Sequence, residues 1–284
     1  MPVLPISDLD DPRVAWYRGT GDPELLRRGG RFVAEGRQVV RRLLDSGRFA
    51  AESVLVTPPA LAALARDLER HGADLPVYLV AAGLMVELTG FNIHRGCLAV
   101  GLRPPDGSPG QVVLAAPAPA LVVVLERAAN ADNVGGVFRN ARAFGAAAVL
   151  LDPSSCDPLY RKAIRTSMGA ALEVPVARVT PWPGGLAQLR EQGLRILALD
   201  PGERAVDIGA SVDLLGAPRV ALLVGNEGVG LSDEARAVAD AQLRIPMAPG
   251  VDSLNLATAT GIALYVAAEA RRQRGRAGSR PRAT

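Results

Sequence analysis

Six short runs of consecutive apolar residues mark the second half of the chain, and helical spacing separates them. Strands that are apolar on both faces are typical of a parallel sheet with helices packed on either side. In such sheets, ligands bind beyond the C-terminal ends of the strands. The pattern therefore predicts an α/β domain whose chemistry lies in the loops that follow its strands. The expected strands are 121–125, 147–151, 174–179, 195–199, 220–224 and 242–245, and the expected helices are about 134–144, 158–168, 184–191, 232–239 and 256–272.

The front of the chain also alternates helices and strands, which predicts a second, smaller α/β domain. Asp22 and Pro23 have the character of a helix start. The other expected elements are helices at 35–46, 59–70 and 81–88 and strands at 54–56, 77–80 and 97–102.

Prolines and glycines are densest at 103–110 and 116–119, and proline can neither extend a helix nor donate to a sheet ladder. This segment is predicted to be an interdomain linker, in which 111–115 has the composition of a short strand. The predicted boundaries are 1–103 for the smaller domain, 104–119 for the linker, 120–272 for the larger domain and 273–284 for a disordered basic tail.

Hydrophobic residues make up 49% of the 284 residues and charged residues 21%, the balance of a soluble globular chain. Two cysteines without a CxxC exclude a disulfide framework, and two histidines argue against a His/Cys zinc site, so no metal is expected. No apolar run approaches the roughly 18 residues of a membrane span, and acidic residues lie where a signal peptide would be apolar. We therefore expect a cytoplasmic protein that does not enter a membrane.

The net charge of +3 is a property of the C-terminal end. Residues 271–284 contain six arginines and no acid, and the rest of the chain carries a net charge of −3. Such a tail either contacts RNA phosphates or is simply solvated, and composition does not decide between the two.

The loop after the strand at 121–125 is the first that is rich in polar residues. Asn133 has the character of a helix N-cap, with Gly135 and Gly136 in the first turn. Glycine within a helix costs up to ~1 kcal/mol relative to alanine, so two together indicate close approach of a ligand or of another backbone. Arg139 follows two turns later and could project beside the loop. Taken alone, this segment is better explained as a capped helix with a surface arginine.

Two later loops have a similar character. Residues 225–231 form a glycine-rich strand-to-helix turn whose order, G-x-x-G-x-G, differs from the dinucleotide fingerprint, and Glu227 within it would repel a pyrophosphate. Ser232 is placed to cap the next helix. After the last strand, a long polar loop leads into an apolar helix, for which Ser253 or Asn255 is a plausible cap.

Taken together and in this order, these segments resemble the three signature motifs of the SpoU (TrmH-type) family of RNA ribose methyltransferases. The matching residues are 133–139 with 143–145, then 225–231, then 245–247 with 253–255. The front domain is similar, more loosely, to the L30e-like substrate-binding domain of many members, through 32–36 and His94-Arg95-Gly96. Arg95 stands where the family usually has glutamine.

The resemblance implies a SPOUT-like larger domain with a trefoil knot, a homodimer, and S-adenosylmethionine as the cofactor. It implies methyl transfer to a ribose 2′-hydroxyl of structured RNA, with 23S ribosomal RNA favoured over transfer RNA by family analogy. The implied cofactor contacts are Leu199, Gly225, Asn226, Ile245, Met247 and Leu254, and the implied catalytic residues are Asn133, Arg139, Glu227, Ser253 and Asn255.

The motifs contain no histidine, so histidine cannot be the base. The family view gives this role to Arg139, but a guanidinium pKa above 12 makes a literal arginine base hard to justify. Our hypothesis is that Arg139 binds the phosphate beside the target and lowers the pKa of the 2′-hydroxyl, while the other four residues orient ribose, Arg139 and cofactor. The alternatives are a transfer RNA methyltransferase, a non-catalytic RNA-binding protein and, disfavoured by the loop order, a nicotinamide-dependent oxidoreductase.

Overall fold

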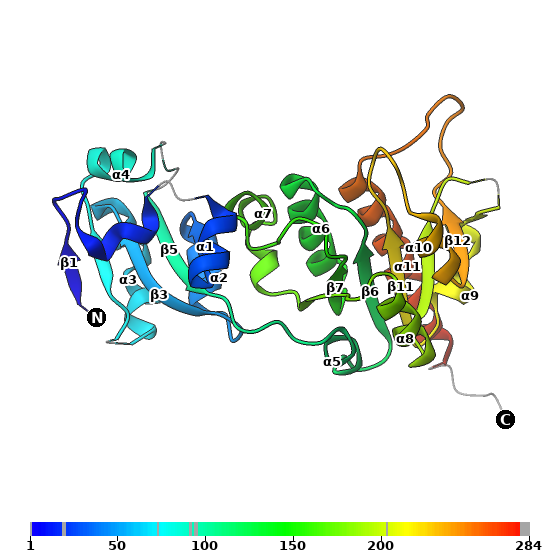
Figure 1. Cartoon of the computed structure of the whole chain (residues 1–284). Coiled ribbons are helices and arrows are strands. Elements are labelled where there is room, and N and C mark those ends of the chain that lie inside the picture. Colours follow the sequence, from blue (N-terminus) through cyan, green and yellow to red (C-terminus); the bar gives the residue numbers. More distant parts are fainter. Residues whose placement is uncertain are drawn as a thin grey trace. The chain divides into compact units, whose positions relative to one another are not determined.

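The computed structural model describes residues 2–18, 21–72, 74–90, 93, 96–202 and 204–278, the last four of these by their backbone alone. The chain forms two compact units (Figure 1). The first unit consists of Met1–Pro105 and Asp157–Glu173, and the second of Asp106–Cys156 and Val174–Thr284. Among the described residues, no helix combines the length and the apolar character that a membrane crossing requires.

The second unit is built on a seven-stranded sheet in the order β10-β12-β9-β11-β6-β7-β8. Every neighbouring pair is parallel, as the apolar runs predicted. The sequence missed β10 because two residues carry no periodicity. The strands are β6 (Ala120–Leu125), β7 (Ala148–Leu151), β8 (Val176–Arg178), β9 (Arg195–Leu199), β10 (Val206–Asp207), β11 (Arg219–Val224) and β12 (Ala241–Arg244).

Helices cover this sheet, and the longest is the C-terminal one. Its contact with α6 is close: a Cβ built on Gly136 of α6 would lie 2.7 Å from the Ala257 Cβ of α11. This backbone approach accounts for the glycine that the sequence placed in the first turns of α6. The helices of the unit are α5 (Pro109–Leu114), α6 (Ala131–Ala143), α8 (Gly184–Glu191), α9 (Val212–Leu215), α10 (Asp233–Val238) and α11 (Leu256–Gly278), with a short 3-10 turn η3 (Ile208–Ala210).

Three expectations for this unit are wrong. Residues 111–115 do not form a strand, because a capping box between Ser108 and Gln111 starts the helix α5. Helix α6 begins earlier than expected, and its N-cap is Asn130, whose side chain accepts from the Asp132 N–H. The basic segment from 273 is not a disordered tail as far as 278, because α11 continues to that point; residues 279–284 lie outside the described part of the chain.

Arg271 is the first of the six arginines in the basic stretch 271–284, and its side chain is part of the fold. It donates to the carbonyl oxygens of Leu215, Ala120 and Ala217. Partial burial lowers the pKa of its guanidinium. Because Ala120 begins β6, this arginine fastens α11 to the start of a central strand.

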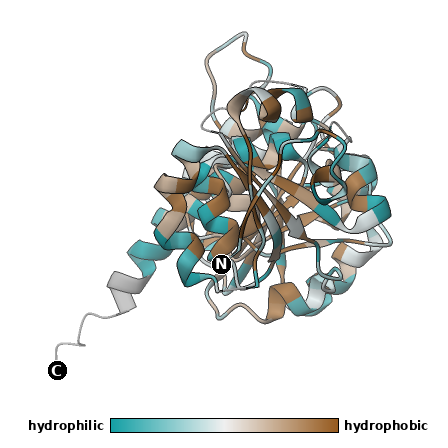
Figure 2. Cartoon of the chain, turned by 90° about the vertical axis from the view of Figure 1, so that its left-hand side faces the viewer, coloured by the Kyte–Doolittle hydropathy of each residue, from teal (hydrophilic) through white to brown (hydrophobic). Residues whose placement is uncertain are grey.

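The first unit contains a five-stranded mixed sheet in the order β1-β4-β3-β5-β2. In Figure 2 the strands in the interior are mostly brown, whereas the helices outside them carry both teal and brown residues. The strands are β1 (Val3–Pro5), β2 (Arg31–Glu35), β3 (Ala50–Val56), β4 (Val77–Leu79) and β5 (Cys97–Leu102), and the helices are α1 (Asp22–Gly29), α2 (Arg37–Leu44), α3 (Pro58–Arg70) and α4 (Ala82–Thr89), preceded by the 3-10 turn η1 (Pro12–Tyr17). Asp22 is the first residue of α1, after the N-cap Gly21.

Asp157–Glu173 joins the first unit although its neighbours in sequence belong to the second. It contains the helix α7 (Arg161–Thr166) and the 3-10 turn η2 (Ala170–Leu172). Its apolar side chains Leu159, Ile164 and Leu172 are buried in the core formed by β2, β3 and α2. The sequence-based boundary placed this segment in the larger domain, because hydrophobic spacing does not say which core a helix completes. His94 and Arg95 of the L30e-like motif lie outside the described residues.

Candidate active site

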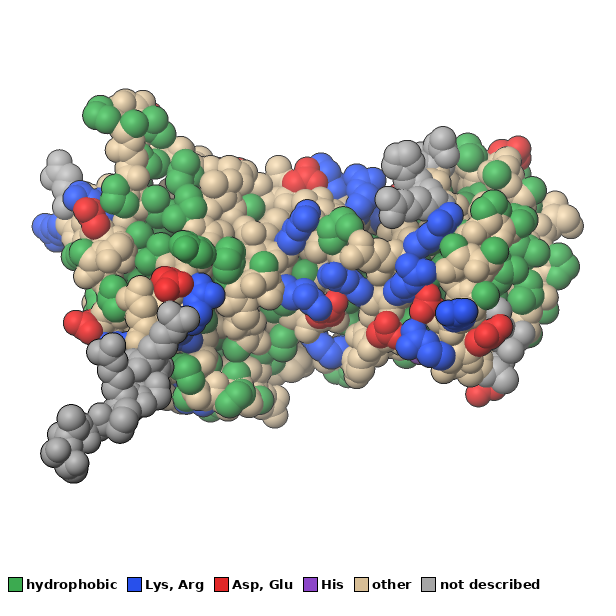
Figure 3. Space-filling view, turned by 180° about the vertical axis from the view of Figure 1, so that it is seen from behind, with side chains coloured by type: hydrophobic (Ala, Val, Ile, Leu, Met, Phe, Trp, Pro, Cys, Tyr) green, Lys and Arg blue, Asp and Glu red, His purple; other side chains and the backbone are tan. Residues whose placement is uncertain are grey.

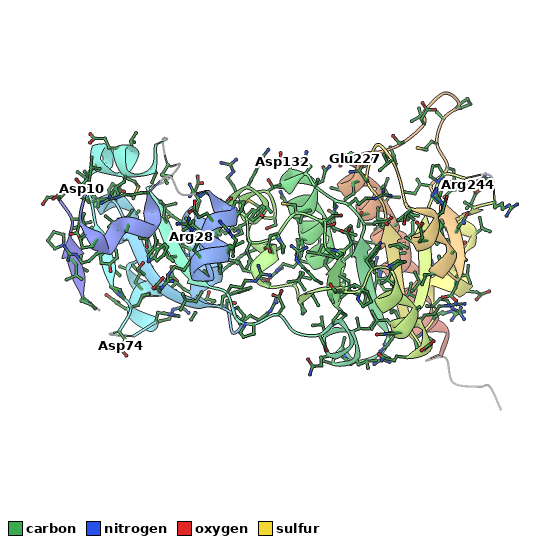
Figure 4. The ribbon with its side chains drawn as sticks, in the orientation of Figure 1. Asp10, Arg28, Asp74, Asp132, Glu227 and Arg244 are labelled. Atoms are coloured by element: carbon green, nitrogen blue, oxygen red, sulfur yellow. The ribbon has the colours of Figure 1, made fainter. Side chains whose placement is uncertain are left out.

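A cavity of about 400 Å³ opens at the C-terminal ends of β9, β11 and β12 in the second unit. This is the edge at which parallel sheets bind ligands. Two residues that line it are labelled in Figure 4: Glu227, on the loop after β11, and Arg244, at the end of β12. Eight of the eleven sequence-predicted site residues line the cavity: Leu199, Gly225, Asn226, Glu227, Ile245, Met247, Ser253 and Leu254.

The glycine-rich loop after β11 forms one wall of the cavity. The Gly230 N–H donates to the Asn226 carbonyl over 2.9 Å, so that the loop closes on itself. A Cβ on Gly225 would lie only 2.4 Å from the Gly230 carbonyl carbon. Real Cβ atoms do not approach backbone so closely, so the turn requires glycine at 225 and presents backbone groups to the cavity.

Glu126, directly after β6, anchors the far end of the same loop. Its side chain is buried, and its Oε1 accepts from Trp182 Nε1 at 2.9 Å and from the Ser232 hydroxyl at 2.6 Å. Oε2 accepts from the Ser232 N–H at 2.8 Å. The Ser232 hydroxyl in turn accepts from Ala235 N–H, which caps α10. Sequence reasoning did not single out Glu126, although an acidic residue that directly follows a buried apolar strand was a usable signal.

The neighbouring Arg127 ties the loop to β6 a second time. Asn226 Nδ2 donates to the Arg127 carbonyl at 3.0 Å, and Arg127 Nη2 donates to the Gly230 carbonyl at 3.3 Å. Arg127 has a left-handed φ of 54°, which a non-glycine residue adopts at some cost. The loops after β6 and β11 are therefore held as one body.

Asn133, Asn255 and Glu227 form a hydrogen-bonded cluster that joins all three sequence motifs. Asn255 Nδ2 donates to Asn133 Oδ1 at 2.9 Å and to Glu227 Oε1 at 2.6 Å. Glu227 Oε1 also accepts from the Leu256 N–H at 2.9 Å. Asn255 Oδ1 accepts from the Ala257 and Thr258 N–H groups, so Asn255 rather than Ser253 caps α11.

Arg139 does not join this cluster within the chain. It is exposed, and it is not among the described residues that line the cavity. The reason is helical geometry: at about 100° per residue, the six positions from Asn133 turn the side chain onto another face of α6. Asn140, one residue later, lies on the Asn133 side and donates to the Ala257 carbonyl at 2.7 Å.

Charged side chains that the sequence analysis passed over complete the cavity. Asp200, next to Leu199, lines it together with Arg236, and Asp200 Oδ2 lies 3.4 Å from Arg236 Nε. Arg244 also lines the cavity, and its Nε donates to Asp207 Oδ1 at 2.6 Å. The cavity is therefore bounded by backbone and apolar groups with ion pairs at its edge, which suits a small ligand with both apolar and charged parts.

Comparison with known proteins identifies the class to which this fold and cavity belong. Residues 120–265 match the SpoU rRNA Methylase family. A relative from Mycobacterium bovis, named as an uncharacterized tRNA/rRNA methyltransferase, is 41% identical over 267 residues, which cover 93% of this chain and 91% of the relative.

Two solved structures are similar over nearly the whole chain. An AdoMet-bound rRNA methyltransferase from Sinorhizobium meliloti has a TM-score of 0.79 at 26% identity, covering 95% of this chain and 98% of its own. The SpoU methyltransferase AviRb from Streptomyces viridochromogenes in complex with AdoMet has a TM-score of 0.77 at 25% identity, covering 93% and 100%.

The chain therefore belongs to the SpoU family, and it is an RNA methyltransferase that uses S-adenosylmethionine. The predictions of family, cofactor and α/β fold class are confirmed. The trefoil knot, the L30e-like substrate-binding role of the first unit, the homodimer and the roles of the site residues stay predictions.

Proposed function

We propose that this protein transfers the methyl group of S-adenosylmethionine to a ribose 2′-hydroxyl of 23S ribosomal RNA, acting in the cytoplasm. The observation that carries the proposal is the meeting of three distant motifs in the second unit. The second and third motifs line one cavity. Asn255 of the third motif donates to Asn133 of the first motif and to Glu227 of the second. A chain that only bound RNA would not need this arrangement.

The cavity fits the cofactor by size and by chemistry. Its volume of about 400 Å³ lies within the usual range for small-molecule sites. Gly225 has no side chain at the point where a Cβ would clash with the Gly230 backbone, so the loop backbone itself faces the cavity. We infer that backbone groups near Gly225, Ile245 and Leu254 hold the adenosine part, with Leu199, Asn226 and Met247 beside them.

S-adenosylmethionine supplies an electrophilic methyl group on its sulfonium, so the protein has to align this group with the ribose oxygen and assist loss of the hydroxyl proton. Glu227 carries a carboxylate at the cavity, held by Asn255 and by the Leu256 N–H. We assign to Asn133, Glu227, Ser253 and Asn255 the orientation of the ribose and of the cofactor.

We assign to Arg139 the phosphate next to the target ribose, where its charge lowers the pKa of the 2′-hydroxyl. The exposure of Arg139 on α6 supports a contact with a second molecule rather than with its own cavity. Arg139→Ala and Arg139→Lys are expected to abolish most turnover while the affinity for S-adenosylmethionine stays unchanged. Near-wild-type turnover in either variant would show that Arg139 does not have this role.

We infer a homodimer as part of the same proposal. Ile262 and Tyr265 of α11 expose 36% and 53% of their surface, and the Tyr265 ring meets Phe144 at the end of α6 edge to face. These exposed apolar groups on α11, beside the end of the motif-bearing helix α6, favour a second copy of this chain as their partner. The trefoil knot and an L30e-like role for the first unit belong to the same proposal.

Mapping of ribose methylation in total RNA, with and without the gene, tests the substrate. Loss of a single 2′-O-methyl group in 23S ribosomal RNA is expected. Loss of a site in transfer RNA instead would move the proposal to the alternative substrate, and loss of a base methyl group would overturn ribose specificity.

A further inference from the structure

Helix α7 presents a cationic side to solvent. From Pro158 to Leu172 the sequence contains Arg161, Lys162 and Arg165 and no acidic residue. Lys162 and Arg165 are exposed, whereas Ala163 and Ile164 between them are fully buried. The helix is therefore amphipathic, with its apolar side in the core of the first unit and its basic side outward.

The segment that carries α7 is fixed at both ends to the first unit. The Arg161 N–H donates to Asp22 Oδ2 at 2.8 Å. Asp157 pairs with Arg103 at 2.7 Å, and Glu173 pairs with Arg42 at 3.3 Å. These contacts place the basic side of α7 on a rigid support rather than on a loose loop.

Helix α1 lies next to α7, since the Asp22 contact joins their first turns (Figure 1). Its last turn carries Arg27 and Arg28, both exposed, and Figure 4 labels Arg28. Arg28 is paired with Glu24 at 3.0 Å on the surface, where water and salt weaken such a pair. Figure 3 shows further Lys and Arg side chains over the first unit, interspersed with acidic ones.

We propose that Arg27 and Arg28 of α1 and Lys162 and Arg165 of α7 form one surface that binds the phosphate backbone of the RNA substrate. This inference rests on the proposed action on RNA and adds where that RNA is held. Spaced cations on two rigid helices suit phosphates in a row, and such contacts give affinity and register without reading sequence. The segment Asp157–Glu173, which follows β7 and precedes β8 in sequence, thus contributes to substrate binding as part of the first unit.

The test compares salt dependence of RNA binding in two charge-matched variants. Lys162→Gln/Arg165→Gln removes two cations from the proposed surface. Arg66→Gln/Arg195→Gln removes two exposed arginines elsewhere, one in α3 and one at the start of β9. A 20-base-pair RNA duplex serves as probe, because backbone contacts do not depend on sequence.

The α7 variant is expected to bind about tenfold more weakly, and its slope of log K against log salt is expected to be shallower by about 1.8, close to 0.9 per lost phosphate contact. The control variant is expected to keep the wild-type slope. Equal salt slopes in all three proteins would overturn the proposal. An equal loss of RNA affinity in the two variants would overturn it as well.

Titration with S-adenosylmethionine and a melting curve for each variant separate this result from misfolding and from failure of the proposed function. Both variants are expected to bind the cofactor and to melt as the wild type does. If the wild type binds the duplex through α7 but does not methylate ribose, the proposed RNA-binding surface stands and only the proposed 2′-O-methylation is wrong.

Discussion

At the scale of single residues, the cavity depends on groups that are not among its lining residues. Glu126 is the clearest example: a buried carboxylate that receives three hydrogen bonds from Trp182 and Ser232. Glu126→Gln replaces one acceptor oxygen by an NH₂ that faces donors. We expect a loss of about 1–3 kcal/mol in the free energy of unfolding, measured in urea, and weaker binding of S-adenosylmethionine. Glu191→Gln, on the exposed end of α8, is the matched control, and an equal effect there would contradict the account.

Gly225 is the second test at this scale. Gly225→Ala puts a methyl group 2.4 Å from the Gly230 carbonyl carbon, so the loop must move. Forced overpacking costs about 1–3 kcal/mol, and we expect a matching loss of cofactor affinity in isothermal titration. Gly209→Ala, where a Cβ meets nothing within 4 Å, should bind normally. An unchanged affinity in Gly225→Ala would show that this wall does not hold the cofactor.

At the scale of elements, Asn255 performs two tasks that can be separated. Its Oδ1 caps α11, and its Nδ2 joins Asn133 to Glu227. Asn255→Ala should lose about 1 kcal/mol of stability and the activity with it. Asn255→Ser keeps a capping oxygen but no amide donor, so its melting temperature should recover while methyl transfer does not. Recovery of both would make Asn255 a cap and nothing more.

Most of the helices and strands of the second unit, but not their side-chain contacts, could be predicted from the sequence. The strands of the second unit other than β10 follow from hydrophobic runs, and the cavity follows from the loops at their ends. Asn130 and Asn133 are equally good caps by residue type, and only the course of the chain after β6 decides between them. The side of α6 on which Arg139 lies, and the partners of Glu126, depend on packing between segments far apart in sequence, which periodicity does not encode.

At the scale of the whole molecule, the proposed homodimer can be tested at the exposed apolar surface of α11. Tyr265→Arg places a charge on the α11 surface that exposes Ile262, and burying that charge in an interface is costly. We expect the variant to be a monomer by light scattering and to lose turnover while it retains S-adenosylmethionine binding. Leu114→Arg, at an exposed apolar residue of α5, is the control and should remain a dimer. A monomeric and active wild type would contradict this requirement.

The most direct test is to label RNA with methyl-tritiated S-adenosylmethionine and the purified protein, and then to hydrolyse the RNA in alkali. A methylated 2′-oxygen cannot attack the adjacent phosphate, so the account predicts that the label appears in alkali-resistant dinucleotides and disappears in Arg139→Ala. Label in mononucleotides would mean that the methyl group goes to a base, and the proposed ribose chemistry would then be wrong.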